Sequence, residues 1–126
     1  MSYQILNDAK RNVGYKTVGS AWKCDKDGYG SESPDWKGTS WYRMMEPAGT
    51  QIPEYAVTNQ YCGTSTTGSL KGAHHPTETG VAVDRKVCFG SCSNSWARNI
   101  KIMKCASYFL YYLPDVVHCN LRYCAV

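Results

Sequence analysis

The seven cysteines in a chain of 126 residues constrain the fold more than any other feature. Five of them (Cys88, Cys92, Cys105, Cys119 and Cys124) lie in the stretch 84–124, which also holds the densest strand-forming runs. The other two, Cys24 and Cys62, lie upstream, where disulfides can fasten the first half of the chain to this stretch. Such a cysteine content in a short chain is typical of an oxidising compartment. Because seven is odd, one thiol must stay free or pair with another chain.

The length and composition predict one domain, residues 1–126, with a modest core and an aromatic surface. Charged residues make up 19% of the chain, which also has 10 tyrosines and 4 tryptophans. The net charge is +4, and the lysines and arginines are scattered singly or in pairs, so no basic run predicts nucleic-acid binding. No apolar run has the length of a membrane span. Residues 1–3 open directly onto polar sequence without a secretory signal, which taken alone predicts a cytosolic chain. The cysteine content predicts an oxidising compartment instead, so we expect a secreted chain from which the leader is absent.

Alternating apolar and polar residues predict strands at 81–88 and 99–104. The apolar run 108–113 predicts a third strand, joined to the second by a hairpin. Further candidates are a strand at 40–45, a weaker strand at 55–62 and an edge strand at 14–18, whereas 24–38 and 63–80 have the composition of loops. The predicted fold is therefore mainly β: a small antiparallel, sandwich-like module with about three disulfides and long loops.

Several short motifs, in order along the chain, resemble a known family. Ser40-Trp41-Tyr42-Arg43 resembles its Gly-Trp-Tyr-Arg signature, and residues 72–80 resemble its Gly-x-His-Pro…Gly segment. Residues 85–88 resemble its Arg-Lys-x-Cys, residues 108–113 its Tyr-Tyr-Val-Tyr-x-Leu, and residues 119–124 its closing Cys-x-Leu-x-Tyr-Cys. The chain is similar to the eight-cysteine extracellular domain of uromodulin, found also in a pancreatic zymogen-granule glycoprotein and in invertebrate surface proteins. The resemblance covers residues 23–125, leaves 1–22 as an N-terminal extension, and implies an extracellular β module without known enzymatic activity.

The resemblance also implies how the cysteines pair. It implies the disulfides Cys24–Cys119, Cys62–Cys124 and Cys88–Cys92, while two family cysteines that look like partners of one another are both missing from this chain. Cys105 is then left over, because its counterpart pairs with a cysteine upstream of the domain. Two interpretations stay open: an interchain bridge that holds a homodimer, or a free thiol buried beside the strand 100–104.

The long loop that follows Cys24 is the main candidate for a binding site, since inserted loops on a rigid scaffold often carry function. The predicted calcium ligands are the four carboxylates Asp25, Asp27, Glu32 and Asp35, because Ca²⁺ prefers oxygen ligands. The predicted sugar-binding residues are Tyr29, Asp35 and Trp36 of this loop, together with His74, the histidine that the family motif lacks. In the alternative interpretation the loop is merely solvated and Trp36 packs down as a lid.

Other chemistries fit the sequence less well. The spacing of candidate zinc ligands is only a loose match to known zinc sites; these candidates are His74, His75, His118 and the cysteine pairs 88/92 and 119/124. Cysteines of secreted proteins also tend to be oxidised, which removes them as ligands. A nucleophile built on Cys105 has no support from the family. No asparagine lies in an Asn-x-Ser/Thr sequon, so a role in carbohydrate recognition would require the protein to bind glycans rather than to carry N-linked ones.

We therefore expect a secreted, lectin-like carbohydrate-binding protein, not an enzyme, with galactose-type specificity and Ca²⁺ as a cofactor. Its expected partners are glycans or glycoproteins, with no nucleic acid and no membrane insertion. Dimerisation through Cys105 would convert weak single-site affinity into avidity. The alternative is an extracellular structural or protein-interaction module with no small ligand.

Overall fold

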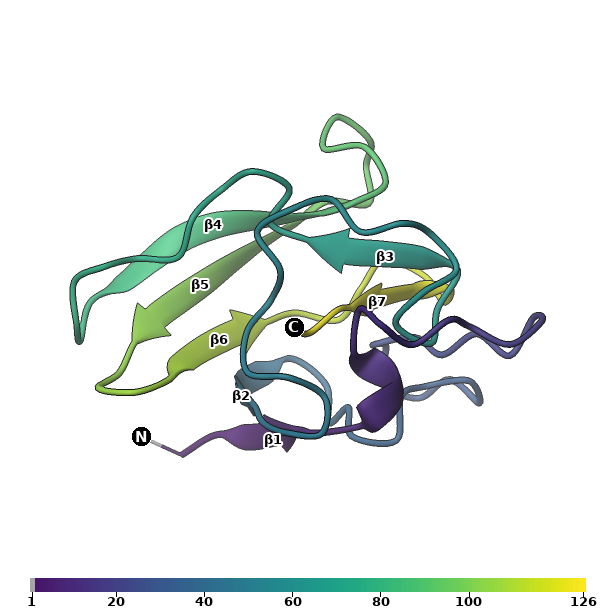
Figure 1. The fold of residues 1–126 in the computed structure, drawn as a ribbon, viewed down its shortest axis with the longest axis horizontal. Coiled ribbons are helices and arrows are strands. Elements are labelled where there is room, and N and C mark those ends of the chain that lie inside the picture. The colour runs from purple at the N-terminus through teal and green to yellow at the C-terminus, as the bar shows by residue number, and fades with distance from the viewer. Residues whose placement is uncertain (1) are drawn as a thin grey trace.

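A computed structural model describes residues 2–126 as one curled β-sheet with long loops (Figure 1). The elements are β1 (Gln4–Leu6), the 3₁₀ helix η1 (Ala9–Arg11), β2 (Ser40–Met44), β3 (Thr66–Ser69), β4 (Ala82–Phe89), β5 (Arg98–Lys104), β6 (Phe109–Leu113) and β7 (Leu121–Tyr123). The seven strands follow the order β1-β2-β6-β5-β4-β3-β7. The prediction of a mainly β, disulfide-stapled fold is confirmed, with one continuous sheet in place of two facing ones.

The centre of the sheet is antiparallel and its two ends are parallel. β2, β6, β5, β4 and β3 pair antiparallel in turn, whereas β1 runs parallel to β2 and β7 runs parallel to β3. The antiparallel prediction is therefore wrong at both edges. β1 and β7 each have three residues, too few for an alternating pattern to reveal them in the sequence.

The longer predicted strands are confirmed, but two weaker predictions are wrong. β2, β4, β5 and β6 lie where alternation or apolar runs predict them, and the hairpin between β5 and β6 closes through the Cys105 N–H, which donates to the Tyr108 carbonyl at 2.8 Å. Residues 55–62 form no regular strand, and the strand of this region is β3, within the segment 63–80 predicted as a loop. The edge strand expected at 14–18 is reduced to a single bridge between Lys16 and Tyr61.

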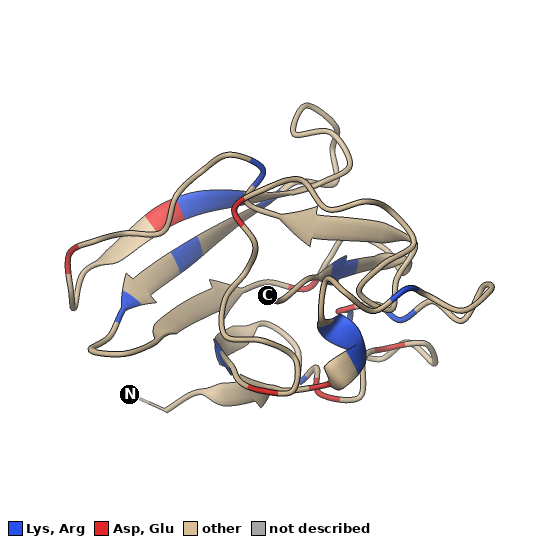
Figure 2. Cartoon of the chain, in the orientation of Figure 1, with Lys and Arg blue, Asp and Glu red and all other residues tan. Residues whose placement is uncertain are grey.

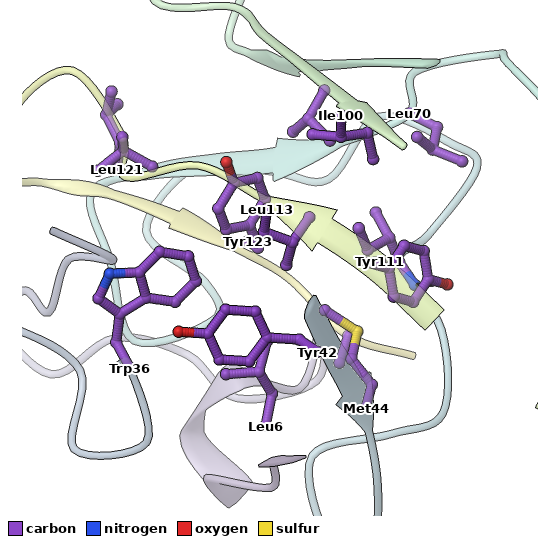
Figure 3. Packing of buried hydrophobic residues seen from close by; sticks show 14 of the residues in the cluster. Leu6, Trp36, Tyr42, Met44, Leu70, Ile100, Tyr111, Leu113, Leu121 and Tyr123 are labelled. Carbon is purple, nitrogen blue, oxygen red and sulfur yellow. Dashed lines mark hydrogen bonds between the residues drawn. The ribbon is translucent and has the colours of Figure 1, made fainter. Parts of the chain in front are cut away.

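The core packs between the concave side of the sheet and the loops that cross it, and tyrosines fill much of it (Figure 3). Tyr42, Tyr111 and Tyr123 are fully buried, and each hydroxyl has a hydrogen-bond partner. Tyr112, on the opposite side of β6 from Tyr111, is 38% exposed. The tyrosines of β6 therefore divide between the core and the sheet surface.

Three disulfides fasten the loops to this core: Cys24–Cys119, Cys62–Cys124 and Cys88–Cys92. They are the same pairs that the family resemblance implies. Cys24 and Cys119 are 95 residues apart in sequence, so their bond ties the long acidic loop to the C-terminal segment. Within residues 2–126, no helix has the length and apolar character needed to cross a bilayer.

Candidate binding loop and its ion-pair support

Asp25 and Asp35, two of the four predicted calcium ligands, form buried ion pairs with Arg11. Arg11 Nη1 lies 2.7 Å from Asp25 Oδ2, and Arg11 Nη2 lies 2.5 Å from Asp35 Oδ1. The side chains of Arg11 and Asp25 are fully buried, and that of Asp35 is 7% exposed. Burial raises the pKa of Asp35, but the Arg11 guanidinium outweighs burial and holds this pKa below its usual value. Both carboxylates thus have a protein cation as their partner, which corrects the prediction that they bind Ca²⁺.

The N-terminal extension supplies Arg11 and holds it in place. Asp8 precedes η1, and its carboxylate accepts a hydrogen bond from the Lys10 N–H at 3.2 Å. The same carboxylate forms an ion pair with Arg122. The Asp8 backbone N–H donates to Asp35 Oδ2 at 3.0 Å. Sequence reasoning missed this cluster, because a single arginine in a polar, unpatterned segment carries no periodic signal. The Asp8-x-x-Arg11 spacing around a short helical turn is the only local hint.

Trp36 belongs to the core and offers no ring to a sugar, which corrects a second prediction. Its side chain is 3% exposed, stacks on Tyr42 with a centroid separation of 4.7 Å, and lies 5.8 Å from the ring of Tyr123 (Figure 3). The indole N–H donates to Asp115 Oδ1 at 2.7 Å. The alternative interpretation, in which Trp36 packs down, describes this residue correctly. The indole therefore anchors the loop rather than binding a ligand.

The other half of the loop remains at the surface and presents Asp27, Tyr29 and Glu32. Tyr29 is 49% exposed, Asp27 is exposed and Glu32 is half-buried. The Gly28 N–H donates to Glu32 Oε2 at 3.2 Å, and the Asp27 N–H donates to Asp115 Oδ1 at 3.1 Å. We call Asp27, Glu32 and Asp115 the surface carboxylates. Backbone amides therefore fix two of the three, those of Glu32 and Asp115.

The surface carboxylates carry uncompensated negative charge. In the described part of the chain, none of the three is in a salt bridge, in contrast to Asp25 and Asp35. The nearby Lys26 ammonium donates to the Val117 carbonyl at 3.0 Å and lies 5.1 Å from the Tyr29 ring centroid. Figure 2 shows acidic segments gathered in the loops beside η1. The arrangement can accept hydrogen bonds from hydroxyl groups next to an exposed aromatic ring.

No preformed metal site accompanies these carboxylates. Across residues 2–126, no group of three or more His, Cys, Asp or Glu side chains is placed to hold a metal ion. The cysteines considered for zinc, 88, 92, 119 and 124, are all in disulfides and cannot act as thiolate ligands. Of the predicted calcium ligands, only Asp27 and Glu32 keep carboxylates without a protein cation.

His74 and His75 form a separate cluster with Glu54. His74 Nδ1 lies 2.9 Å from Glu54 Oε1, and the imidazole is otherwise exposed to solvent. His75 is 8% exposed; its Nδ1 lies 2.7 Å from Glu54 Oε2 and its Nε2 lies 2.7 Å from the Tyr111 hydroxyl. His74 therefore pairs with Glu54, a residue outside the predicted sugar site, and His75 has a structural role between Glu54 and Tyr111.

Cys105 lies in the connection between β5 and β6, half-buried beside Tyr108. Within residues 2–126 it forms no disulfide. A half-buried position at the end of a hairpin differs from the buried sheet position of the free-thiol interpretation. The homodimer remains a prediction.

The fold, the three disulfides and the order of the motifs together define an extracellular, cysteine-stapled β domain. The family model of the uromodulin-like D8C domain matches residues 42–125, and the chain belongs to this family. The chain is also similar to the human pancreatic secretory granule membrane major glycoprotein GP2, with 27% identity over 116 residues. This match covers 89% of the chain and 21% of GP2, so the chain corresponds to about a fifth of that relative.

Proposed function

We propose that this protein is a secreted carbohydrate-binding module that reads galactose-type sugars through the exposed half of its acidic loop. The observation that carries the proposal is that one loop presents the half-exposed Tyr29 ring together with the Asp27 and Glu32 carboxylates, and that no surface carboxylate forms a salt bridge within residues 2–126. Carboxylates are strong acceptors for vicinal hydroxyl groups. The apolar face of a pyranose ring packs against an aromatic ring, which orients the hydroxyls towards such acceptors.

The buried ion pairs support this proposal because they fix the conformation of the acidic loop. Arg11 fixes Asp25 and Asp35, and the Cys24–Cys119 disulfide fastens the start of the loop. Trp36 anchors its far end in the core. A preorganised loop binds more tightly because less conformational freedom is lost when the ligand arrives.

The test is binding of β-galactosides on a glycan array and by calorimetry, with Ca²⁺ and with EDTA. We expect binding by the natural chain and a loss of roughly tenfold or more in Asp27→Asn and Glu32→Gln, because each removes a charged hydrogen-bond acceptor. The matched control is Asp84→Asn, an exposed carboxylate on β4 that pairs with Lys101 at 2.7 Å. A chain that binds no glycan under either condition contradicts the proposal.

The two solution conditions separate two forms of the same site. Binding that vanishes in EDTA would mean that a cation completes the surface carboxylates, as the sequence hypothesis held for Asp27 and Glu32. Binding that persists in EDTA would mean that the hydroxyls bond directly to the carboxylates. Tyr29→Ala should weaken binding in both cases, since the stacking surface is lost.

A second candidate, an extracellular protein-interaction module, is favoured by the outer surface of the sheet. Trp41 of β2 pairs with Tyr112 of β6, which pairs with Lys101 of β5, so these side chains form a row across three strands. The rings of Trp41 and Tyr112 lie 5.5 Å apart, and Arg43 lies over the ring of Tyr108 at 3.9 Å. Trp, Tyr and Arg are the residues that dominate protein interfaces. Under this function, Tyr112→Ser abolishes capture of an extracellular protein partner, and Asp27→Asn does not.

A further inference from the structure

A hollow on the outer side of β3 and β4 is lined almost entirely by hydrogen-bond donors and small side chains. Its volume is about 260 Å³, and its lining consists of Ala56, Val57, Asn59, Thr67, Ser69, Lys71, Cys88 and Gly90. Ser69 lies directly opposite Cys88 in the register of β3 and β4, so both side chains project from the same side of the sheet. The segment 56–59 forms the facing wall.

Ser69 places an unused hydroxyl in this hollow. The residue as a whole is 2% exposed, and its hydroxyl is not among the buried polar atoms of residues 2–126 that lack a partner, so the oxygen opens onto the hollow. The neighbouring Thr67 hydroxyl is already used, since it donates to the Val57 carbonyl at 2.7 Å. The Ser69 hydroxyl can therefore donate to a ligand that enters the hollow.

Asn59 and Lys71 add further donors. Asn59 Oδ1 accepts a hydrogen bond from the Thr67 N–H at 3.3 Å, which leaves both amide N–H groups of Asn59 without a partner in the described chain. The Lys71 ammonium donates to the Gly90 carbonyl and keeps two further N–H groups. Lys71 has a φ of 48°, in the left-handed region that favours glycine, so the chain keeps a lysine where the backbone alone favours a smaller residue. No Asp or Glu lines the hollow.

We infer that this hollow binds an anionic sugar residue, one that bears a sulfate or a carboxylate. An oxyanion matches the donors of Ser69, Asn59 and Lys71, none of which faces a competing carboxylate. The volume exceeds that of an oxyanion and leaves room for part of a sugar ring against Ala56 and Val57. The site shares no residue with the acidic loop, so it goes beyond the function proposed above and does not depend on it.

The test is an NMR titration of ¹⁵N-labelled protein with galactose 6-sulfate, galacturonic acid and galactose. We expect both acidic sugars to shift the amide signals of Asn59, Ser69 and Lys71, and galactose to leave them in place. Ser69→Ala and Lys71→Gln should each raise the Kd for an acidic sugar roughly tenfold or more, because each removes a bond to a charged group. Should Ser69→Ala fail to fold, the exposed Lys71 provides the variant that remains testable.

The matched control is Lys86→Gln, which removes the same charge from an exposed position on β4 outside the hollow. Its Kd should stay within about twofold of the natural chain, since screened surface charges contribute little. An equal loss in Lys86→Gln and Lys71→Gln would mean non-specific attraction and overturn the site, as would equal shifts with galactose. Inorganic sulfate that acts as strongly as galactose 6-sulfate would overturn the assignment to a sugar. Asp27→Asn should leave the titration unchanged, which separates this site from the loop.

Discussion

At the scale of single residues, Arg11 is the side chain on which the acidic loop depends. Its replacement by alanine leaves Asp25 buried without its salt-bridge partner and Asp35 with the more distant Arg122 guanidinium at 3.9 Å. Breaking a buried pair in this way costs about 3–5 kcal/mol. We expect Arg11→Ala to lower the free energy of unfolding by that amount in urea titrations. Lys10→Ala, one residue away and exposed, should change it by less than about 1 kcal/mol. Equal effects of the two substitutions would contradict the ion-pair account.

His75 predicts how stability depends on pH. Burial lowers its pKa from 6.5, and the hydrogen bond and charge of Glu54 oppose this only in part. The folded protein therefore binds fewer protons than the unfolded chain just below pH 6.5, so stability falls as the pH drops through that value. Hydrogen bonds from His74 and His75 lower the pKa of Glu54 from 4.5 to about 2, so a further loss follows as the pH falls below 4.5. Both contributions are fully present at pH 7.

Thermal unfolding between pH 7.5 and pH 5 measures the first of these losses. His75→Gln should flatten the dependence in this range, because the substituted side chain does not titrate. His118→Gln is the matched control, since His118 is exposed and its Nδ1 contacts only the carbonyl of Cys119. A pH profile that is the same in His75→Gln and in the natural chain would show that another group controls it.

At the scale of elements, β3 depends on a glycine that allows close packing. A Cβ on Gly68 would lie 2.4 Å from a ring carbon of Phe89 and 2.8 Å from the Arg122 carbonyl oxygen. Gly68→Ala must therefore push β3 away from β4 or β7, which we expect to cost about 1–3 kcal/mol in chemical denaturation. Gly30→Ala is the control, because open space surrounds that position. A neutral Gly68→Ala would mean that the sheet yields here without cost.

The same strand explains which elements the sequence could predict. β4, β5 and β6 show alternation or apolar runs over five residues or more, and their positions follow from the pattern. β3 reads Thr-Thr-Gly-Ser, four small polar residues with the composition of a loop, and only its pairing with β4 and β7 makes it a strand. Ser69 of this strand lines the anionic-sugar site, so that site could not be found from pattern alone.

At the scale of the whole molecule, the acidic loop shows the limit of reading composition as function. Clustered Asp residues predict a cation site only if no arginine reaches them, and Arg11 approaches Asp25 from a segment 14 residues earlier in the chain. The exposed half of the same loop keeps the acidic character that its composition predicts, because no cation within residues 2–126 forms a salt bridge with Asp27 or Glu32. Tertiary structure therefore divides one acidic segment into a structural half and a candidate binding half.

The remaining question at this scale is whether two copies act together through Cys105. Its position at the end of the β5–β6 hairpin, half-buried beside Tyr108, would let a second copy approach without disturbing the three disulfides. We predict a mass that doubles under non-reducing conditions and returns to that of one chain on reduction. Cys105→Ser should then remain a folded monomer with unchanged single-site affinity in calorimetry, but with lower retention on a dense galactoside surface, because only a bivalent molecule gains avidity. A monomeric natural chain with one alkylatable thiol would contradict the dimer, and the surface carboxylates would then have to act as a single weak site.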